Sequence, residues 1–297
     1  MPHFFHKREF HLQCQTYTAR LIQRACISES AQCYHLEFEI DEMEKFDFAA
    51  GQFISAVAVD GRGKTQTRAY SIASTAGANR FDLCVNRVEG GFFSNYLADL
   101  PEGDAVQVHG PHGHFTLRNP VTDSIFVATG TGIAPMRSFT QWLFPESGEH
   151  AGEDRSDGRH IWLIYGTRHE SEIYYRDYFE RIAAERENFH YVTTLSRADE
   201  LWTGKRGYVQ EYLGPIVESR GGALAPIQSV QTLGSTTSLA GTVADTVVAV
   251  EERVLSEPLA FDIHTYICGL NNMVSAVRER LTGYGWHKKQ IIFERYD

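Results

Sequence analysis

The chain has 297 residues, enough for two domains, and 42% of them are hydrophobic, which is ordinary for a soluble globular protein. Its formal net charge of -10 excludes non-specific nucleic-acid binding, which requires a basic surface. The N-terminus has no apolar run long enough for a signal peptide, and no stretch approaches the roughly 20 apolar residues of a membrane span. We therefore expect a cytoplasmic protein.

The cysteine content indicates free thiols and no metal site. An odd number of cysteines without a secretory signal favours thiols over a disulfide framework. Their spacings match no zinc pattern and no clustered iron–sulfur run. If the chain moves electrons, its cofactor is therefore organic or lies on a partner. The cysteines are Cys14, Cys26, Cys33, Cys84 and Cys268.

Residues 1–119 are predicted to form an antiparallel β-barrel. Short alternating or apolar runs, separated by Gly, Asp and Asn, are typical of its strands. One helical signal interrupts them, where Phe93, Leu97 and Leu100 recur at helical spacing in 92–100. The expected strands lie at 17–27, 32–40, 51–59, 68–74 and 80–88.

Residues 120–297 are predicted to form an α/β domain, because strands here alternate with helices and so indicate a parallel sheet. An insertion at about 214–258 interrupts the order; it has no aromatic residue and is rich in Gly, Ser, Thr and Ala. The expected strands lie at 124–130, 160–166, 189–196, 263–269 and 290–296, and the helices at 134–144, 174–187, 207–213 and 273–285.

The stretch RAYSIAS places Arg68, Tyr70 and Ser71 close together. Alternation of this kind suits a half-buried strand, on whose wet face Arg and Tyr are ordinary. The alternative is that the three side chains face a ligand with an anionic group, a flat ring and a hydrogen-bonding edge.

The run VATGTGIAP places Gly130, Thr131 and Gly132 after an apolar strand, with Pro135 opening a helix. Glycine lets the backbone approach a ligand, proline suits the first helical turn, and helix N-terminal N–H groups attract phosphate. A tight turn without a ligand is the alternative for this motif alone. It is not the Gly-x-Gly-x-x-Gly fingerprint, because Pro135 stands where the third glycine would be.

Further strand ends carry glycine, serine or arginine. Arg168 follows the second strand of the α/β region, Ser196 and Arg197 follow the third, and Gly269 follows Cys268 on a later one. In an open parallel sheet, ligands bind outside the carboxyl ends of the strands. Packing alone would favour neither glycine nor arginine there, so the set indicates a ligand site.

In combination and in order, these motifs resemble the ferredoxin–NADP reductase family of FAD-dependent flavin reductases. The motifs are RAYS, GGFFSN, GTGIAP, CGLNNM and a terminal FERYD, and the resemblance covers about 17–297 apart from the insertion. It implies an enzyme that transfers hydride between NADP(H) and FAD and passes single electrons to or from a ferredoxin or flavodoxin. Two alternatives stay open: the reductase component of a multicomponent oxygenase, and a non-catalytic flavin-binding redox sensor.

The resemblance implies that the barrel domain binds FAD. Arg68 would contact the pyrophosphate, Tyr70 would stack on the isoalloxazine, and Ser71 would hydrogen-bond near flavin N5. A guanidinium matches phosphate oxygens and a phenol ring offers a flat apolar face, so the chemistry agrees. The other implied FAD contacts are the backbone of Cys84 and Val85, and a helix start at Gly90, Gly91 and Ser94, which is otherwise a hairpin turn with an N-cap serine.

The resemblance also implies the catalytic and NADP(H)-binding residues. Ser71, Cys268 and Glu294 would be catalytic, with Cys268 beside nicotinamide C4. Tyr296 matches an aromatic that covers the flavin; here Asp297 follows it, and a surface tyrosine on a frayed end is the alternative. Ser196, Arg197 and Arg206 would grip the 2′-phosphate, unless this is only a solvated loop. The remaining implied NADP(H) contacts are Gly130, Thr131, Gly132, Pro135, Arg168, Gly269 and Met273.

Overall fold

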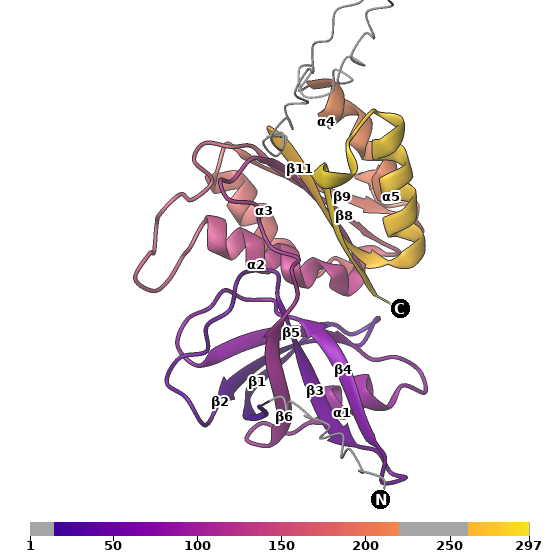
Figure 1. The fold of residues 1–297 in the computed structure, drawn as a ribbon. Helices are drawn as coiled ribbons and strands as arrows, with labels where there is room; N and C mark the ends of the chain where they lie inside the picture. The colour runs from indigo at the N-terminus through magenta and orange to yellow at the C-terminus, as the bar shows by residue number, and fades with distance from the viewer. Residues whose placement is uncertain (1–14, 220–260, 297) are drawn as a thin grey trace, which may run out of the picture.

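The computed structural model describes residues 15–219 and 261–296. These residues form an antiparallel six-stranded sheet followed in the chain by a parallel six-stranded sheet with helices on both faces (Figure 1). The predicted fold class is therefore confirmed. No helix in the described ranges is long and apolar enough to cross a membrane. From residue 220 onward, the predicted insertion lies outside the described residues.

The barrel unit consists of the first sheet and α1 (Phe92–Asp99). Its strand order is β4-β3-β6-β1-β2-β5, and all neighbours are antiparallel. A single bridge between Ile72 and Leu83 joins the two edges and nearly closes the sheet into a barrel. The strands are β1 (Tyr17–Ser28), β2 (Cys33–Ile40), β3 (Phe53–Val59), β4 (Thr65–Ser71), β5 (Arg80–Asn86) and β6 (Ala105–His112).

Alternating side chains build the core of the barrel unit. On β2, Leu36, Phe38 and Ile40 are fully buried, whereas the glutamates between them are partly exposed. Phe38 stacks on Phe81 of β5 with ring centroids 5.4 Å apart. Leu97 of α1 is also fully buried, so the helix covers one end of this core.

Strand β6 is missing from the predicted strands, although it lies between β1 and β3 in the sheet. Its sequence AVQVHGPH contains Gly-Pro just before its last residue, and this pair is a typical turn signal. Gly110 has φ of 140° and lies before Pro111, so the turn-forming pair sits at the end of the strand and its first half still pairs on both sides.

The parallel-sheet unit consists of the second sheet and α2–α5. Its strand order is β10-β9-β8-β7-β11-β12, with all neighbours parallel. Helices α2 (Ile133–Leu143) and α3 (Arg176–Glu185) cover one face, and α4 (Leu213–Ser219) and α5 (Asn271–Gly283) cover the other (Figure 1). The strands are β7 (Asp123–Thr129), β8 (Ile161–Thr167), β9 (Phe189–Leu195), β10 (Lys205–Arg206), β11 (Ile263–Leu270) and β12 (Ile291–Tyr296).

Most predicted elements of this unit are present, with one correction. The expected helix at 207–213 is a 3-10 turn, Val209–Tyr212, that leads directly into α4. The two-residue strand β10 was not predicted, because two exposed cations show no periodicity.

Helix α2 packs against both units at once. Phe139 contacts Tyr266 of the parallel sheet and Phe115, which follows the barrel, with ring centroids 5.4 Å apart in both pairs. A Cβ on Gly51 would lie 2.5 Å from the Phe139 ring, and its φ of +91° also favours glycine. The two units therefore share one apolar core at α2.

Candidate active site

The ends of β7 and β11 form the centre of the candidate site. The chain proceeds from β7 toward β10 on one side and from β11 to β12 on the other, so these neighbouring strands mark the point where the strand order reverses. The 3-10 turn Gly130–Gly132 follows β7. A Cβ on Gly132 would lie 2.2 Å from the carbonyl oxygen of Cys268, so only glycine lets this turn pack against β11.

Three predicted residues form a hydrogen-bonded chain between the two units. The Tyr296 hydroxyl donates to Ser71 Oγ at 2.7 Å, and Ser71 donates to Glu294 Oε2 at 3.1 Å. Ser71 ends β4 of the barrel unit, whereas Glu294 and Tyr296 lie on the same side of β12. Cys268 is the register partner of Glu294 on β11, so it lies beside the same cluster.

Burial favours the neutral form of the acidic groups in this cluster. It raises the pKa of the Glu294 carboxyl, an effect that the hydrogen bond from Ser71 partly offsets. It also raises the pKa of the fully buried Cys268 thiol, so Cys268 is a thiol and not a thiolate at neutral pH. The cluster therefore holds protons close to Ser71.

A second group of predicted residues lies where β4 meets α1. The Tyr70 ring packs 6.1 Å from the ring of Phe93, and burial raises the Tyr70 pKa to about 12. Arg68 lies on the same side of β4 and is exposed. Helix α1 begins after Gly91 without a side-chain cap, because the N-cap residue is a glycine, and Ser94 Oγ accepts from the Val88 N–H at 3.1 Å. An exposed cation, an aromatic face and free helix N–H groups thus occur together.

Cys84 and Val85 lie on β5, an edge strand whose ladder partner is β2. Both residues are buried as a whole, at 6% and 1% exposure, so their side chains are not open to a ligand. Gly90, in the turn that follows β5, has φ of +70°, a conformation that favours glycine.

Exposed cations follow β8 and β9, the strands that lie beyond β7 in the sheet order. The Arg197 N–H donates to the Arg168 carbonyl at 2.9 Å, so the two strand ends lie side by side. Ser196 is exposed and its Oγ donates to the Thr167 carbonyl at 3.3 Å. Arg206 differs, because its guanidinium donates to three carbonyl oxygens in 198–202 at 2.7–3.2 Å and so holds its own loop.

Two residues near the predicted set were missed by the sequence analysis. Thr129 Oγ1, at the end of β7, is buried without a hydrogen-bond partner in the described part of the chain. It lies 2.5 Å from where a Cβ on Gly269 would stand, and Met273 lies 2.8 Å from the same point. Tyr208 is 61% exposed just after β10, and the aromatic in a polar loop was its only sequence signal.

Known proteins are similar to this chain in sequence and in fold. Residues 18–117 match the oxidoreductase FAD-binding domain family, and residues 126–224 match the oxidoreductase NAD-binding domain family. The chain is 36% identical over 290 residues to ferredoxin–NADP reductase B of Sorangium cellulosum (strain So ce56), which covers 96% of this chain and 100% of that protein.

Two more distant relatives were also found, one by sequence and one by structure. The chain is 32% identical over 213 residues to the phenol hydroxylase P5 protein of Acinetobacter pittii, which covers 70% of this chain and 56% of that protein. A solved structure of ferredoxin-NADP+ reductase from Plasmodium falciparum has a TM-score of 0.69 at 20% identity, over 95% of this chain and 96% of that chain, and supports the fold alone. The chain therefore belongs to the ferredoxin–NADP reductase family, FAD-dependent oxidoreductases that use NADP(H).

Proposed function

We propose that this enzyme transfers hydride between NADP(H) and FAD at the cluster of Ser71, Cys268, Glu294 and Tyr296, and exchanges single electrons with a ferredoxin or flavodoxin. The observation that carries the proposal is the hydrogen-bonded chain from Tyr296 through Ser71 to Glu294, which joins the barrel unit to β12, the strand beside β11 in the parallel sheet. When bound, FAD accepts a hydride as an electron pair and releases electrons singly.

The residues around β4, β5 and α1 fit a flavin dinucleotide. Arg68 and the uncapped start of α1 at Gly90, Gly91 and Ser94 would hold the pyrophosphate. Tyr70 would stack on the ring system, and the β5 backbone at Cys84 and Val85 would hold the adenosine half. Such a ligand would thus contact residues of β4, β5 and α1 together.

Ser71 would orient the reacting edge of the site. Its hydroxyl already accepts from Tyr296 and donates to Glu294, so its direction is fixed before substrate arrives. Burial raises the pKa of Glu294, which would favour a proton close to this edge. Cys268 would exclude water there, and Tyr296 would have to move aside to admit the nicotinamide.

The ends of β7, β8 and β9 would hold the nucleotide. The pyrophosphate would bind at the turn Gly130–Gly132 and at the first turn of α2, which contains Pro135. The Thr129 hydroxyl, which has no hydrogen-bond partner among the described residues and lies beside Gly269 and Met273, would give it a further donor. Arg168, Ser196 and Arg197 would bind the 2′-phosphate. Arg206 would keep their loop in place, and the exposed Tyr208 ring would offer a face to the adenine.

The proposed domains divide in the connection between β6 and β7, at residues 119 and 120. The last strand of one sheet ends at His112 and the first strand of the other begins at Asp123, which supports this boundary. We place the protein in the cytoplasm, because Cys26, Cys33, Cys84 and Cys268 are free thiols, which a reducing compartment preserves.

The acceptor is tested by mixing the purified flavoprotein with NADPH and then with ferredoxin or flavodoxin under anaerobic conditions. We expect either carrier to be reduced, and Ser71→Ala to reduce it more slowly while retaining its flavin. The likeness to a phenol hydroxylase component favours a second candidate, a reductase for an oxygenase. Reduction of neither carrier, with flavin still reduced by NADPH, would support that candidate instead.

A further inference from the structure

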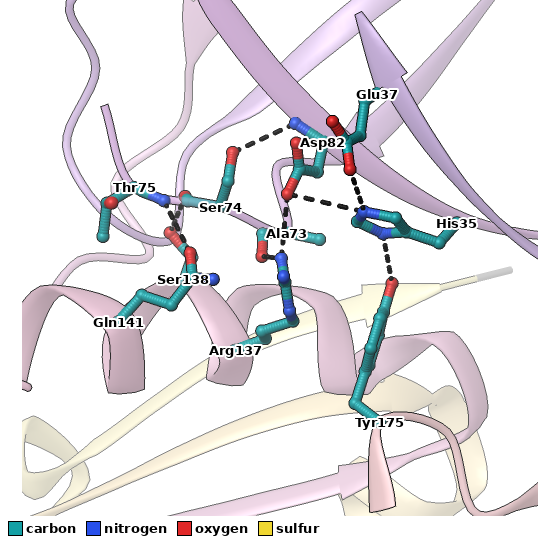
Figure 2. A network of polar contacts seen from close by, with 10 residues as sticks. All are labelled: His35, Glu37, Ala73, Ser74, Thr75, Asp82, Arg137, Ser138, Gln141 and Tyr175. Atoms are coloured by element: carbon teal, nitrogen blue, oxygen red, sulfur yellow. Dashed lines mark hydrogen bonds and ion pairs between the residues drawn. The ribbon is translucent and has the colours of Figure 1, made fainter. Parts of the chain in front are cut away.

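Helix α2 binds three consecutive residues of the barrel unit through one of its faces (Figure 2). The segment is 73–75, which follows β4. Arg137 Nη1 donates to the first carbonyl oxygen at 2.7 Å, and Ser138 Oγ donates to the second at 2.6 Å. Gln141 Oε1 accepts from the third residue's N–H at 3.1 Å. We call Arg137, Ser138 and Gln141 the helix clamp.

Arg137 also forms a charged contact across the boundary. The same Nη1 donates to Asp82 Oδ2 of β5 at 2.9 Å, and the side chains of Arg137 and Asp82 are only 15% and 17% exposed. The guanidinium lies over the ring of Tyr175, 5.0 Å from its centroid. The Tyr175 hydroxyl in turn lies 3.0 Å from Nδ1 of His35 on β2, so a second link returns to the barrel unit (Figure 2).

A buried ion pair is weak evidence of net stability, because the desolvation of both charges offsets their attraction. This pair instead restricts the orientation of the Arg137 side chain. Its Nη1 donates both to a backbone carbonyl and to a carboxylate, and these lie on different segments of the barrel unit. The aromatic ring limits the guanidinium from a third side. Few orientations of α2 satisfy all three contacts together.

The helix clamp lies between the two halves of the proposed reaction site. Its segment 73–75 begins two residues after Ser71, and α2 begins directly after Gly132 of the nucleotide turn. Arg137 is five residues beyond Gly132, about 7.5 Å along a helix at 1.5 Å per residue. A rotation of α2 against the barrel would therefore move the nucleotide turn relative to Ser71.

We propose that Arg137 is a positioning residue for hydride transfer, which holds α2 against the barrel unit and so sets the approach of nicotinamide to flavin. This inference rests on the proposed function. Arg137 acts through the Ala73 carbonyl and through Asp82 and not on the reacting atoms. Alignment of donor and acceptor dominates such a reaction, and a displacement of about 1 Å can lower its rate about a hundredfold.

The test compares flavin-loaded wild type with Arg137→Ala in stopped-flow reduction by NADPH and by 4-deuterated NADPH. We expect flavin content to stay unchanged and the Kd for NADP+ to stay within about twofold, whereas the hydride-transfer rate constant falls about ten- to a hundredfold. The deuterium isotope effect should rise, and Arg137→Lys, which keeps the charge and a donor, should recover most of the rate.

Arg155→Ala is the matched control. Arg155 also forms an ion pair, with Glu153 at 3.0 Å, and lies 5.4 Å over the ring of Trp142, but these contacts stay within the parallel-sheet unit. Its hydride-transfer rate should equal that of wild type. If Arg137→Ala does not fold, Asp82→Asn, which keeps the shape and removes the charge, should still show a slower rate at unchanged NADP+ affinity.

A second readout needs no turnover. Hydrogen–deuterium exchange should become faster at the Thr75 and Gly51 amides, which donate to Gln141 and Ser138, in Arg137→Ala and not in Arg155→Ala. A wild-type hydride-transfer rate in Arg137→Ala, or in Asp82→Asn where the first does not fold, would overturn the inference, as would unchanged exchange. Wild type that NADPH fails to reduce would instead contradict the proposed function, and the exchange result would still decide whether the clamp exists.

Discussion

Tyr296 donates a 2.7 Å hydrogen bond to Ser71, a residue 225 positions earlier in the chain. Strand β12 of the parallel sheet thereby contacts the RAYSIAS stretch of the barrel unit. Because the Ser71 hydroxyl itself donates a hydrogen bond to Glu294, the contact joins the predicted flavin side and nicotinamide side in one chain of hydrogen bonds.

We expect the purified protein to be yellow and to release FAD, not FMN, on denaturation. The start of α1, which has no side-chain cap, would contact a pyrophosphate, and β5 would contact an adenosine half, so both have a ligand only if the flavin is a dinucleotide. Chromatography of the released flavin makes the measurement. Recovery of FMN would contradict the assignment of Cys84, Val85 and Gly91.

Cys268→Ala should slow hydride transfer while the flavin stays bound. Cys268 is fully buried beside Glu294, so its loss opens space where water could enter. Stopped-flow reduction by NADPH makes the measurement, with Cys26→Ala, which changes an exposed thiol on β1, as the control. Equal rates in both variants would mean that Cys268 only fills the core.

Glu294→Gln should stabilise the protein at alkaline pH. Burial raises the folded-state pKa of Glu294, so its contribution to stability is present below the unfolded pKa of about 4.3 and is lost as pH rises through the folded value. Glutamine stays neutral and keeps an acceptor for Ser71. Urea unfolding at pH 4 and pH 8 should show the variant gaining on wild type only at the higher pH; a constant difference would contradict this.

His264 should make the protein less stable in mild acid. Burial lowers the His264 pKa from 6.5 to about 4, and Thr122 Oγ1 lies 2.7 Å from its Nδ1. Because the folded pKa is depressed, stability is present above the unfolded value and is lost as pH falls through the folded value, by at most about 1.4 kcal/mol per pH unit. His264→Gln should lose less stability than wild type between pH 7 and pH 4.5, measured by urea unfolding; parallel curves would refute this.

The sequence predicted what local patterns encode. Alternation in CYHLEFEI and the apolar run SIFVAT predicted β2 and β7, and the ordered motifs proposed Ser71 and Glu294 as site residues, which the fold brings into contact. The sequence analysis missed strand β6 because its Gly-Pro pair is a typical turn signal, although the pair lies near the end of the strand.

Contacts between distant segments could not be predicted in the same way. Arg137 binds groups 55 and 64 residues away, and no periodicity marks such a pair. The loop contacts of Arg206 could not be predicted either: its guanidinium donates to nearby carbonyl oxygens, and its proposed contact with the 2′-phosphate stays a prediction.

The preference for NADPH over NADH tests the central claim most directly. Arg197 is exposed at the end of β9 beside Arg168, and a charge-assisted contact with the 2′-phosphate contributes about 1.5–3 kcal/mol. The measurement is the ratio of kcat/KM for the two nucleotides in wild type, Arg197→Ala and, as a control, Arg181→Ala, which removes a surface partner of Glu146. We predict that wild type and the control favour NADPH and that Arg197→Ala loses about ten- to a hundredfold with NADPH and little with NADH. A wild type that favours NADH, or an unchanged ratio in Arg197→Ala, would contradict the account.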